Sequence, residues 1–493
     1  MNSLNLSQFS GYGVGHFDHP GTTVQSVGAI VIKVTYFFGK INDDIAKDVL
    51  SRPEYYLSRI NFIFILMTGA ALFILGLTAF KNLNNIYYAF LLQLTPLYPP
   101  TVSDHFADVT SESLFIVAVI LFIAVITGVV SSTDENPKVN FKYAVIFGIV
   151  SGFGLACKII FIPLLIIPLI LIRKIKFKAL FSFLTFIFFL IFVFPALSFE
   201  NSVRYVNWIS EILSHSGKYG TGQGSVIDAS LYWSNLKNIF LYDVSFTVSY
   251  TIILITLAYG SFLRFKKPVK GNKYFDLLTG IFFSMTIQVF LVAKHFDQRY
   301  MIAVSMLSVI GLLAVCFTAK DFFTEKLTGK ICASALAIII LFSFTHIIKI
   351  YSSYSGYARN GYESGKITEF IKGNYNNEVL VNSNTINNQI YSLYFGTDWA
   401  GSQKKRYISI IQELHPDYFY FDKYGKNFYL TNTDRIKKEL LNKNRLIFQS
   451  DTNDTIDYFM EKLKTLLGNQ NISYKEVYSN DNNEKLYEIK LNP

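Results

Sequence analysis

Long apolar runs separated by short polar stretches fill the first 350 residues of the chain. The hydrocarbon core of a bilayer is about 30 Å thick, so a crossing helix needs roughly 20 apolar residues. The pattern therefore predicts an α-helical polytopic membrane protein. About ten transmembrane helices are expected between residues 57 and 350, at 57–79, 83–98, 110–131, 141–156, 159–172, 177–197, 239–263, 274–293, 299–318 and 331–350.

The two ends of the chain follow other patterns. Residues 1–56 are predicted to form a first external loop followed by a helix at 24–40, whose apolar residues recur at helical spacing. We favour a position in the membrane interface for this helix over a deeper insertion. Beyond Tyr351 the chain becomes rich in Asn, Lys and Tyr, which predicts an external C-terminal α/β domain over 351–493. Its expected strands are 378–382, 417–421 and 485–491, and its expected helices are 363–373, 404–414, 433–443 and 454–467. The aromatic residues there suit a core or a sugar-stacking surface.

Composition and charge support this division. With 51% hydrophobic and 16% charged residues, the chain is not an ordinary soluble protein. Lys and Arg gather in the loops at 173–178, 264–273 and 320–330, which the positive-inside rule assigns to the cytoplasm. The tail has 18 Lys and Arg against 17 Asp and Glu, so the net charge of +10 reports topology and implies no nucleic acid. We expect a multi-pass protein of the cell (inner) membrane with an extracytoplasmic C-terminal domain.

This topology places Met1 outside without a preceding span. Either a first transmembrane helix is missing upstream of the sequence given, or the segment 24–40 inserts more deeply. The three cysteines fall in or beside predicted spans, and they imply no disulfide framework or zinc site.

Ionisable residues at a membrane boundary are costly and mark functional candidates. Here they gather on the predicted external side, whereas no chain of charges runs through the centres of the spans. The candidates are His16, Asp18 and His19, then Asp104, His105, Asp108 and Glu112, then Lys158, and finally Lys294, His295, Asp297, Arg299 and Tyr300.

Four of these segments carry a resemblance to a known family. The stretch "HFDHPG" (16–21) resembles the external-loop motif of protein mannosyltransferases and their bacterial relatives. In the expected order follow "TSESLFIVAVILFIAV" (110–125), "GLACKIIFIPLLIIP" (154–168) and "QRYMIAV" (298–304), which are similar to the family's acidic span start, its helix ending in lysine and its late Arg-Tyr span. The resemblance covers residues 1–350. It implies the class C membrane glycosyltransferase architecture and the use of polyprenyl-phosphate sugars.

The sequence departs from this family at two points. The family has an acidic residue, often Asp-Glu, after a first transmembrane helix, and no counterpart follows Met1. A missing upstream helix would account for both this absence and the topology. Gly21 stands where the family usually has a second proline, which loosens the loop without removing chemistry.

The transfer reaction suggests roles for the candidates. An attacking hydroxyl needs a carboxylate to take its proton, and Asp18 is the visible candidate, with His19 orienting it or contacting phosphate. The alternative is that Asp18 only caps the following helix. The phosphate leaving group needs cations, for which Arg299 with Tyr300, and Lys158 and Lys294 as point charges, are the donor phosphate-binding candidates. These basic side chains equally suit plain snorkelling to the boundary.

Three further acids, Asp104, Asp108 and Glu112, are candidates for acceptor or metal binding, where Mg²⁺ or Mn²⁺ would suit their oxygens together with Asp18. Solvated acids at a helix start are the alternative. His16, His19 and His105 lack the spacing of a dedicated metal site. The glycine-rich loop 215–228 suits either a flap over the lipid or acceptor, or an ordinary flexible loop.

The sequence thus predicts a glycosyltransferase that moves a sugar from a polyprenyl-phosphate donor to a glycan, lipid or protein acceptor at the outer face of the membrane. Its partners are this donor, the acceptor and membrane lipid. The alternatives are a transporter or flippase of lipid-linked sugars, and a catalytically inactive relative.

Overall fold

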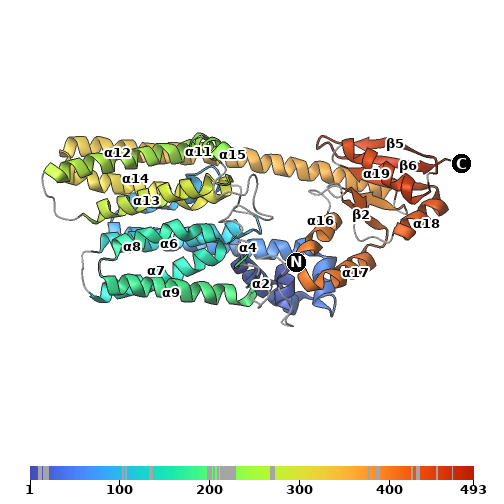
Figure 1. Cartoon of the computed structure of the whole chain (residues 1–493), viewed down its shortest axis with the longest axis horizontal. Helices are drawn as coiled ribbons and strands as arrows, with labels where there is room; N and C mark the ends of the chain where they lie inside the picture. Colours follow the sequence, from blue (N-terminus) through green and yellow to red (C-terminus); the bar gives the residue numbers. More distant parts are fainter. Residues whose placement is uncertain are drawn as a thin grey trace. The chain divides into compact units, whose positions relative to one another are not determined.

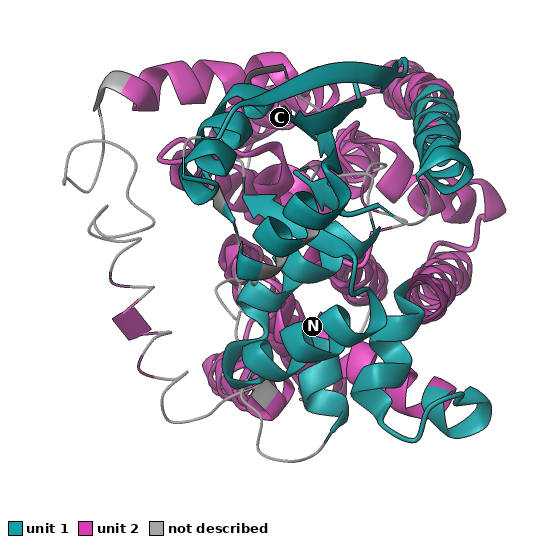
Figure 2. Cartoon of the chain, turned by 90° about the vertical axis from the view of Figure 1, so that its right-hand side faces the viewer, with its two compact units in different colours: residues 1–16, 36–53, 351–493 teal, residues 17–35, 54–350 magenta. Residues whose placement is uncertain are grey.

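The structure is a computed structural model of the whole chain. It describes all residues except 9–13, 15–20, 103–104, 106–107, 133–136, 197–202, 204–205, 208–209, 211–228, 267–271, 376–377, 384–388, 423–425, 429–432, 451–452, 469 and 493. The chain folds into two compact units, as Figure 2 shows. The bundle unit comprises residues 17–35 and 54–350, and the terminal unit comprises residues 1–16, 36–53 and 351–493.

Within the described residues, 8 helices are long and apolar enough to cross a membrane. The predicted fold class, a helical polytopic membrane protein with a C-terminal α/β domain, is thereby confirmed. The helices are α4 (Pro53–Leu83), α6 (Ser111–Ser131), α7 (Pro137–Cys157), α9 (Ile175–Val193), α12 (Val244–Lys266), α13 (Lys273–Val292), α14 (Ile302–Phe322) and α15 (Glu325–Asn374).

The expected spans at 83–98 and 159–172 fold differently from prediction. The first is the short helix α5 (Ile86–Gln93) followed by the 3₁₀ turn η1 (Thr95–Leu97). The second is the 3₁₀ helix η3 (Ile159–Leu165) with α8 (Ile166–Leu171). Pro163 and Pro168 lack the N–H groups that a continuous α-helix would need there. Neither segment is a full-length crossing helix.

The η3–α8 segment still returns the chain from one end of the bundle to the other. Gly148 and Gly152 of α7 approach Leu184 and Phe188 of α9 in the same order, so these two helices run parallel. The segment between them must therefore run the opposite way. It packs antiparallel to α13, where Ser284 Oγ donates to Pro163 O at 2.7 Å and Gly280 lies against Ile167. Helices α8 and α13 are neighbours in Figure 1. The η3–α8 segment, although short, therefore runs between the two ends of the bundle as predicted for the span at 159–172.

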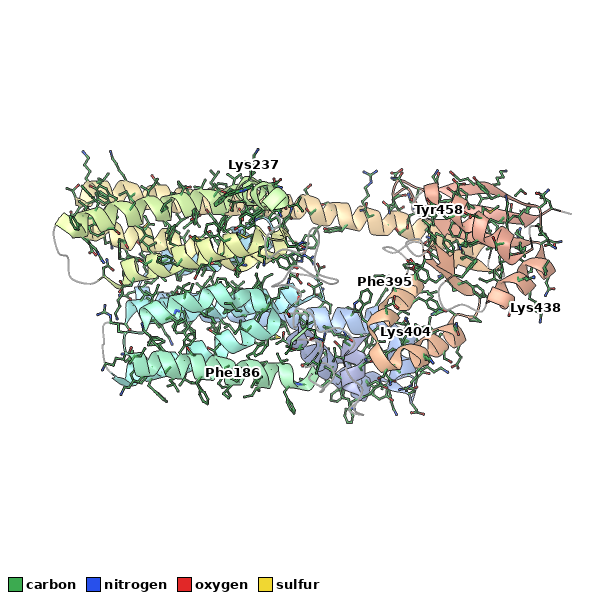
Figure 3. The ribbon with its side chains drawn as sticks, viewed as in Figure 1. Phe186, Lys237, Phe395, Lys404, Lys438 and Tyr458 are labelled. Atoms are coloured by element: carbon green, nitrogen blue, oxygen red, sulfur yellow. The ribbon has the colours of Figure 1, made fainter. Side chains whose placement is uncertain are left out.

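Burial separates the inner from the outer helices of the bundle unit. In α6 and α14, 94% of the most apolar 18-residue stretch is buried, whereas in α9 the buried share of this stretch is 17%. Phe186 on α9, labelled in Figure 3, is 57% exposed. An apolar surface of this kind suits contact with lipid.

Two further helices belong to this part of the chain. The segment predicted to lie in the membrane interface forms α2 (Thr22–Gly39), slightly displaced from the expected 24–40. The expected span at 239–263 begins later, because α11 (Ala229–Tyr242) ends at Tyr242 and α12 starts at Val244 after the intervening Asp243.

The terminal unit joins the start of the chain to its tail. Asn5 in α1 (Asn2–Ser7) donates from Nδ2 to Ala400 O at 2.9 Å and accepts from Tyr407 Oη at 2.6 Å. Both side chains are buried. Lys47 in α3 (Ile45–Ser51) forms a 2.6 Å ion pair with Glu413 of α17 (Lys404–Leu414). The structure therefore groups residues 1–16 and 36–53 with 351–493, whereas the sequence analysis assigned residues 1–56 to the membrane domain.

The tail contains a six-stranded sheet in the order β3-β2-β1-β4-β6-β5. The adjacent strands β2, β1 and β4 are parallel, and the remaining pairings are antiparallel. The predicted helices at 404–414 and 433–443 are confirmed, and the one at 454–467 is shifted by one residue. The helix expected at 363–373 is the end of α15. The elements are β1 (Leu380–Asn382), α16 (Gln389–Gly396), β2 (Tyr418–Asp422), β3 (Asn427–Phe428), α18 (Thr433–Lys443), β4 (Arg445–Ser450), α19 (Asn453–Leu466), β5 (Ile472–Ser479) and β6 (Lys485–Leu491).

Candidate functional site

A buried ion pair marks one end of the bundle unit. Glu112 lies in the first turn of α6, where the helix dipole favours an acid. Lys158 follows the last residue of α7 in extended conformation. The distance from Lys158 Nζ to Glu112 Oε1 is 2.5 Å, and each side chain is only 4% exposed. Ser111 Oγ donates to Glu112 Oε2 at 3.0 Å, so both carboxylate oxygens have a donor.

Arg299 brings a second cation to this pair. Its Nη1 lies 3.7 Å from Glu112 Oε1, and its Nη2 lies 2.5 Å from Asp297 Oδ2. Asp297 also accepts from the backbone N–H of Arg299, which starts the 3₁₀ helix η6 (Gln298–Met301). The Arg299 side chain is 48% exposed. The arginine thus links a buried carboxylate to the surface of the site.

Tyr300 completes this cluster. Its ring lies 5.2 Å from Lys158 Nζ, a cation–π distance, and its carbonyl accepts from Gln288 Nε2 at 2.6 Å. We call Glu112, Lys158, Asp297, Arg299 and Tyr300 the charged cluster. Four of the five were named from the sequence as site residues, and the structure brings them together.

Asp297 is held in its ionised form by its neighbour. Burial opposes ionisation, but the hydrogen bonds and charge of Arg299 hold the pKa of Asp297 below its ordinary value. Asp297 therefore carries a negative charge at neutral pH and keeps the guanidinium of Arg299 in place.

The backbone of Gly21 connects the N-terminal motif to the same end of the bundle. Gly21 N–H donates to Cys157 O at 3.3 Å, and a Cβ on Gly21 would lie 3.8 Å from Ser111 Cβ. Gly21 has φ +58°, a conformation that suits glycine better than the proline common in the family. Gly21, which ends the motif, thus lies between Cys157 and Ser111, the residues that precede Lys158 and Glu112 in the sequence.

The second acidic segment is partly described. His105 Nδ1 lies 3.4 Å from Asp108 Oδ2, and Ser113 Oγ donates to the carbonyls of both residues. These hydrogen bonds attach the turn to the first turn of α6. Lys294 lies on the turn before η6, and its side chain forms no hydrogen bond or ion pair with a described residue.

The remaining candidates fall outside the described residues. These are His16, Asp18, His19, Asp104 and the glycine-rich loop 215–228. Among the described residues, no three His, Cys, Asp or Glu side chains come together as a metal site. Glu112 is engaged by Lys158 and Ser111, so the part of the site that is described fits an ion pair better than a metal ligand.

The sequence analysis missed a buried polar network in the bundle. Asp243 is 5% exposed, and it accepts from Ser245 Oγ at 2.5 Å, Phe246 N at 2.9 Å and Ser305 Oγ at 2.9 Å. Ser245 in turn donates to Tyr98 O at 3.2 Å. The signal was present, because Asp followed by an apolar run is typical of a helix N-cap.

Comparisons with known proteins give one structural likeness. No protein-family model matches the chain, and no curated protein matches its sequence. The structure is similar to the crystal structure of ArnT from Cupriavidus metallidurans bound to undecaprenyl phosphate. The alignment covers 99% of this chain and 96% of that one, at 8% sequence identity and a TM-score of 0.44.

Proposed function

We propose that the protein is a membrane glycosyltransferase that uses a polyprenyl-phosphate sugar as donor. The observation that carries the proposal is the charged cluster at the start of α6 and the end of α7, where Lys158 and Arg299 share the carboxylate of Glu112. Burying charged groups costs several kcal/mol each, so a buried cluster beside an apolar bundle is a functional candidate.

The cluster suits a phosphate group at the membrane boundary. Arg299 is a planar donor that binds phosphate oxygens in pairs, and its side chain is half exposed. Lys158 adds a second positive charge, held 2.5 Å from Glu112. As the sugar leaves, the phosphodiester becomes a monoester and gains negative charge, which these fixed cations stabilise. Glu112 and Asp297 position the cations and do not contact the reacting atoms in this scheme.

The acceptor hydroxyl needs a base, and we assign this role to Asp18. Asp18 is three residues from Gly21, and Gly21 binds Cys157 beside Lys158. An extended chain covers at most ~3.6 Å per residue, so covalent geometry limits the Cα atom of Asp18 to about 11 Å from that of Gly21. His19 orients Asp18 or contacts the phosphate in this proposal.

The experiment is a transfer assay on the purified protein with labelled polyprenyl-phosphate sugars and membrane extract. Arg299→Ala and Asp18→Asn are expected to lower transfer by about two to four decades, the typical value of general-base or electrostatic assistance. Lys176→Ala, an exposed basic residue at the start of α9, is the matched control and is expected to keep full activity. Full activity in Arg299→Ala, or movement of the carrier across vesicles without transfer, would refute the proposal and favour a flippase.

A further inference from the structure

The terminal unit contains a cavity that the transfer reaction does not use. Its volume is about 240 Å³, and it lies where β1, β2 and β4 begin and where α15 and α17 end. Its lining is contributed entirely by residues 371–447. Ligand pockets for drug-sized molecules measure roughly 300–1,000 Å³, so this cavity has room for a single small ring.

One part of the lining is apolar and aromatic. Leu380 and Ile447 are buried residues of β1 and β4, at 4% and 1% exposure. Tyr418 and His415 line the cavity with ring centroids 5.9 Å apart, and both are half-buried. Aromatic rings beside aliphatic side chains offer flat apolar surface to the C–H face of a ligand ring.

The other part of the lining presents an acceptor. Glu378 Oε1 forms an ion pair of 2.5 Å with Arg445 Nη2. The second oxygen, Oε2, is shielded from solvent and has no hydrogen-bond partner among the residues that the structure describes. A buried carboxylate oxygen without a donor costs free energy. Because Oε2 has almost no accessible surface, a ligand hydroxyl or ammonium group satisfies it when the Glu378 side chain turns toward the cavity.

The charges of the lining distinguish between ligand classes. Glu378 and Asp417 contribute two carboxylates, and Lys372 is the basic side chain among the described lining residues. An excess of carboxylates disfavours phosphates and nucleotides. A molecule with hydroxyl donors on its edge and apolar C–H groups on its face fits both halves of the lining.

We propose that this cavity is a carbohydrate-binding site for one neutral or amino sugar ring. Glu378 accepts hydrogen bonds from the sugar's hydroxyl or ammonium groups, while Tyr418 and His415 contact its apolar face. The site lies in the terminal unit and its existence does not depend on the proposed transfer reaction. If that reaction occurs, the site would hold a glycan that contains this sugar ring.

Saturation-transfer NMR on the full chain in detergent tests the proposal. The panel contains glucose, galactose, mannose, N-acetylglucosamine, glucosamine and arabinose, with inorganic phosphate and Ca²⁺ as competitors. At least one sugar is expected to receive saturation, and neither competitor is expected to displace it. Glu378→Gln and Tyr418→Leu are each expected to weaken binding about tenfold or more, since a hydrogen bond to a charged group is worth roughly 1.5–3 kcal/mol.

Three controls separate sugar binding in this cavity from binding at the transfer site and from a loss of folding. Glu476→Gln removes an exposed carboxylate of β5 in the same unit and is expected to leave binding unchanged. Arg299→Ala is expected to abolish transfer but to keep sugar binding, which distinguishes this site from the transfer site. If Glu378→Gln unfolds because Arg445 loses its partner, two other measurements test the proposal. These are sugar binding by Tyr418→Leu and the protection from hydrogen exchange that the sugar gives to residues 371–380 and 414–418. No saturation of any sugar, equal binding in all folded variants, or displacement by Ca²⁺ or phosphate would overturn the proposal.

Discussion

The pairing of Lys158 with Glu112 is the central observation about individual residues. Each residue was named from the sequence for its position at a span boundary, yet the two are 46 positions apart and nothing in the sequence pairs them. The pair is buried, and buried pairs contribute little net stability while their disruption is costly. Its presence is therefore better accounted for by chemistry than by folding.

Removing one partner of this pair should destabilise the bundle. Glu112→Ala leaves Lys158 buried without a counter-charge, and we expect a loss of about 3–5 kcal/mol in unfolding free energy. The double variant Glu112→Gln with Lys158→Met should recover most of this stability but not the transfer activity. Thermal unfolding in detergent and the transfer assay measure the two effects. Recovered activity in the double variant would show that the pair is only structural.

His415 makes the stability of the terminal unit depend on pH. Burial lowers the pKa of His415 from its ordinary value of 6.5, so the folded chain binds the proton less readily than the unfolded chain. As pH falls below about 6.5, the unfolded state gains the proton first and stability decreases. We expect this decrease in thermal unfolding between pH 7.5 and 5.5, and a smaller one in His415→Asn. His295→Gln, an exposed histidine, is the control and should behave as wild type.

Among the elements, the contact of α7 with α9 depends on two small residues. Gly148 and Gly152 are four apart, the spacing of small residues that lets membrane helices approach closely. A Cβ on either glycine would lie 2.6 Å from a Cβ of α9. The parallel pairing of these helices fixes the direction of η3–α8, the segment that follows Lys158.

Adding one methyl group to this contact should separate the helices. Gly152→Ala is expected to cost about 1–3 kcal/mol, the usual penalty for overpacking. Gly69→Ala in α4 is the matched control, because nothing lies within 4 Å of a Cβ there. Thermal unfolding of both variants in the same detergent gives the comparison. Equal unfolding temperatures would mean that α9 moves freely to accommodate the methyl group.

For the whole molecule, the ends of the chain are joined in one unit. Asn5 and Tyr407, 402 residues apart, share a buried hydrogen bond. The 50-residue helix α15 is about 75 Å long at 1.5 Å per residue, far more than a bilayer needs. Part of this helix therefore extends beyond the hydrocarbon core.

The predicted membrane orientation can be tested by cysteine labelling in intact cells. His295→Cys places an exposed thiol on the turn beside the charged cluster, and Lys176→Cys places one at the start of α9. Because basic loops stay in the cytoplasm, an impermeant maleimide should label the first variant in intact cells and the second only after permeabilisation. The unmodified protein, whose Cys157 and Cys316 are buried, serves as the blank. Labelling of Lys176→Cys in intact cells would reverse the predicted topology.

Local patterns in the sequence were sufficient for most of the helix positions, the C-terminal α/β domain and most of the charged cluster's members, because apolar periodicity and boundary charges are properties of neighbouring residues. They did not reveal that residues 1–8 pack with the tail, that η3–α8 is not a regular span, or that Asp243 joins Ser305. They also could not show that Glu378 has an unsatisfied oxygen beside a cavity. Each of these depends on contacts between distant segments, whose partners are selected by packing and desolvation in the folded chain.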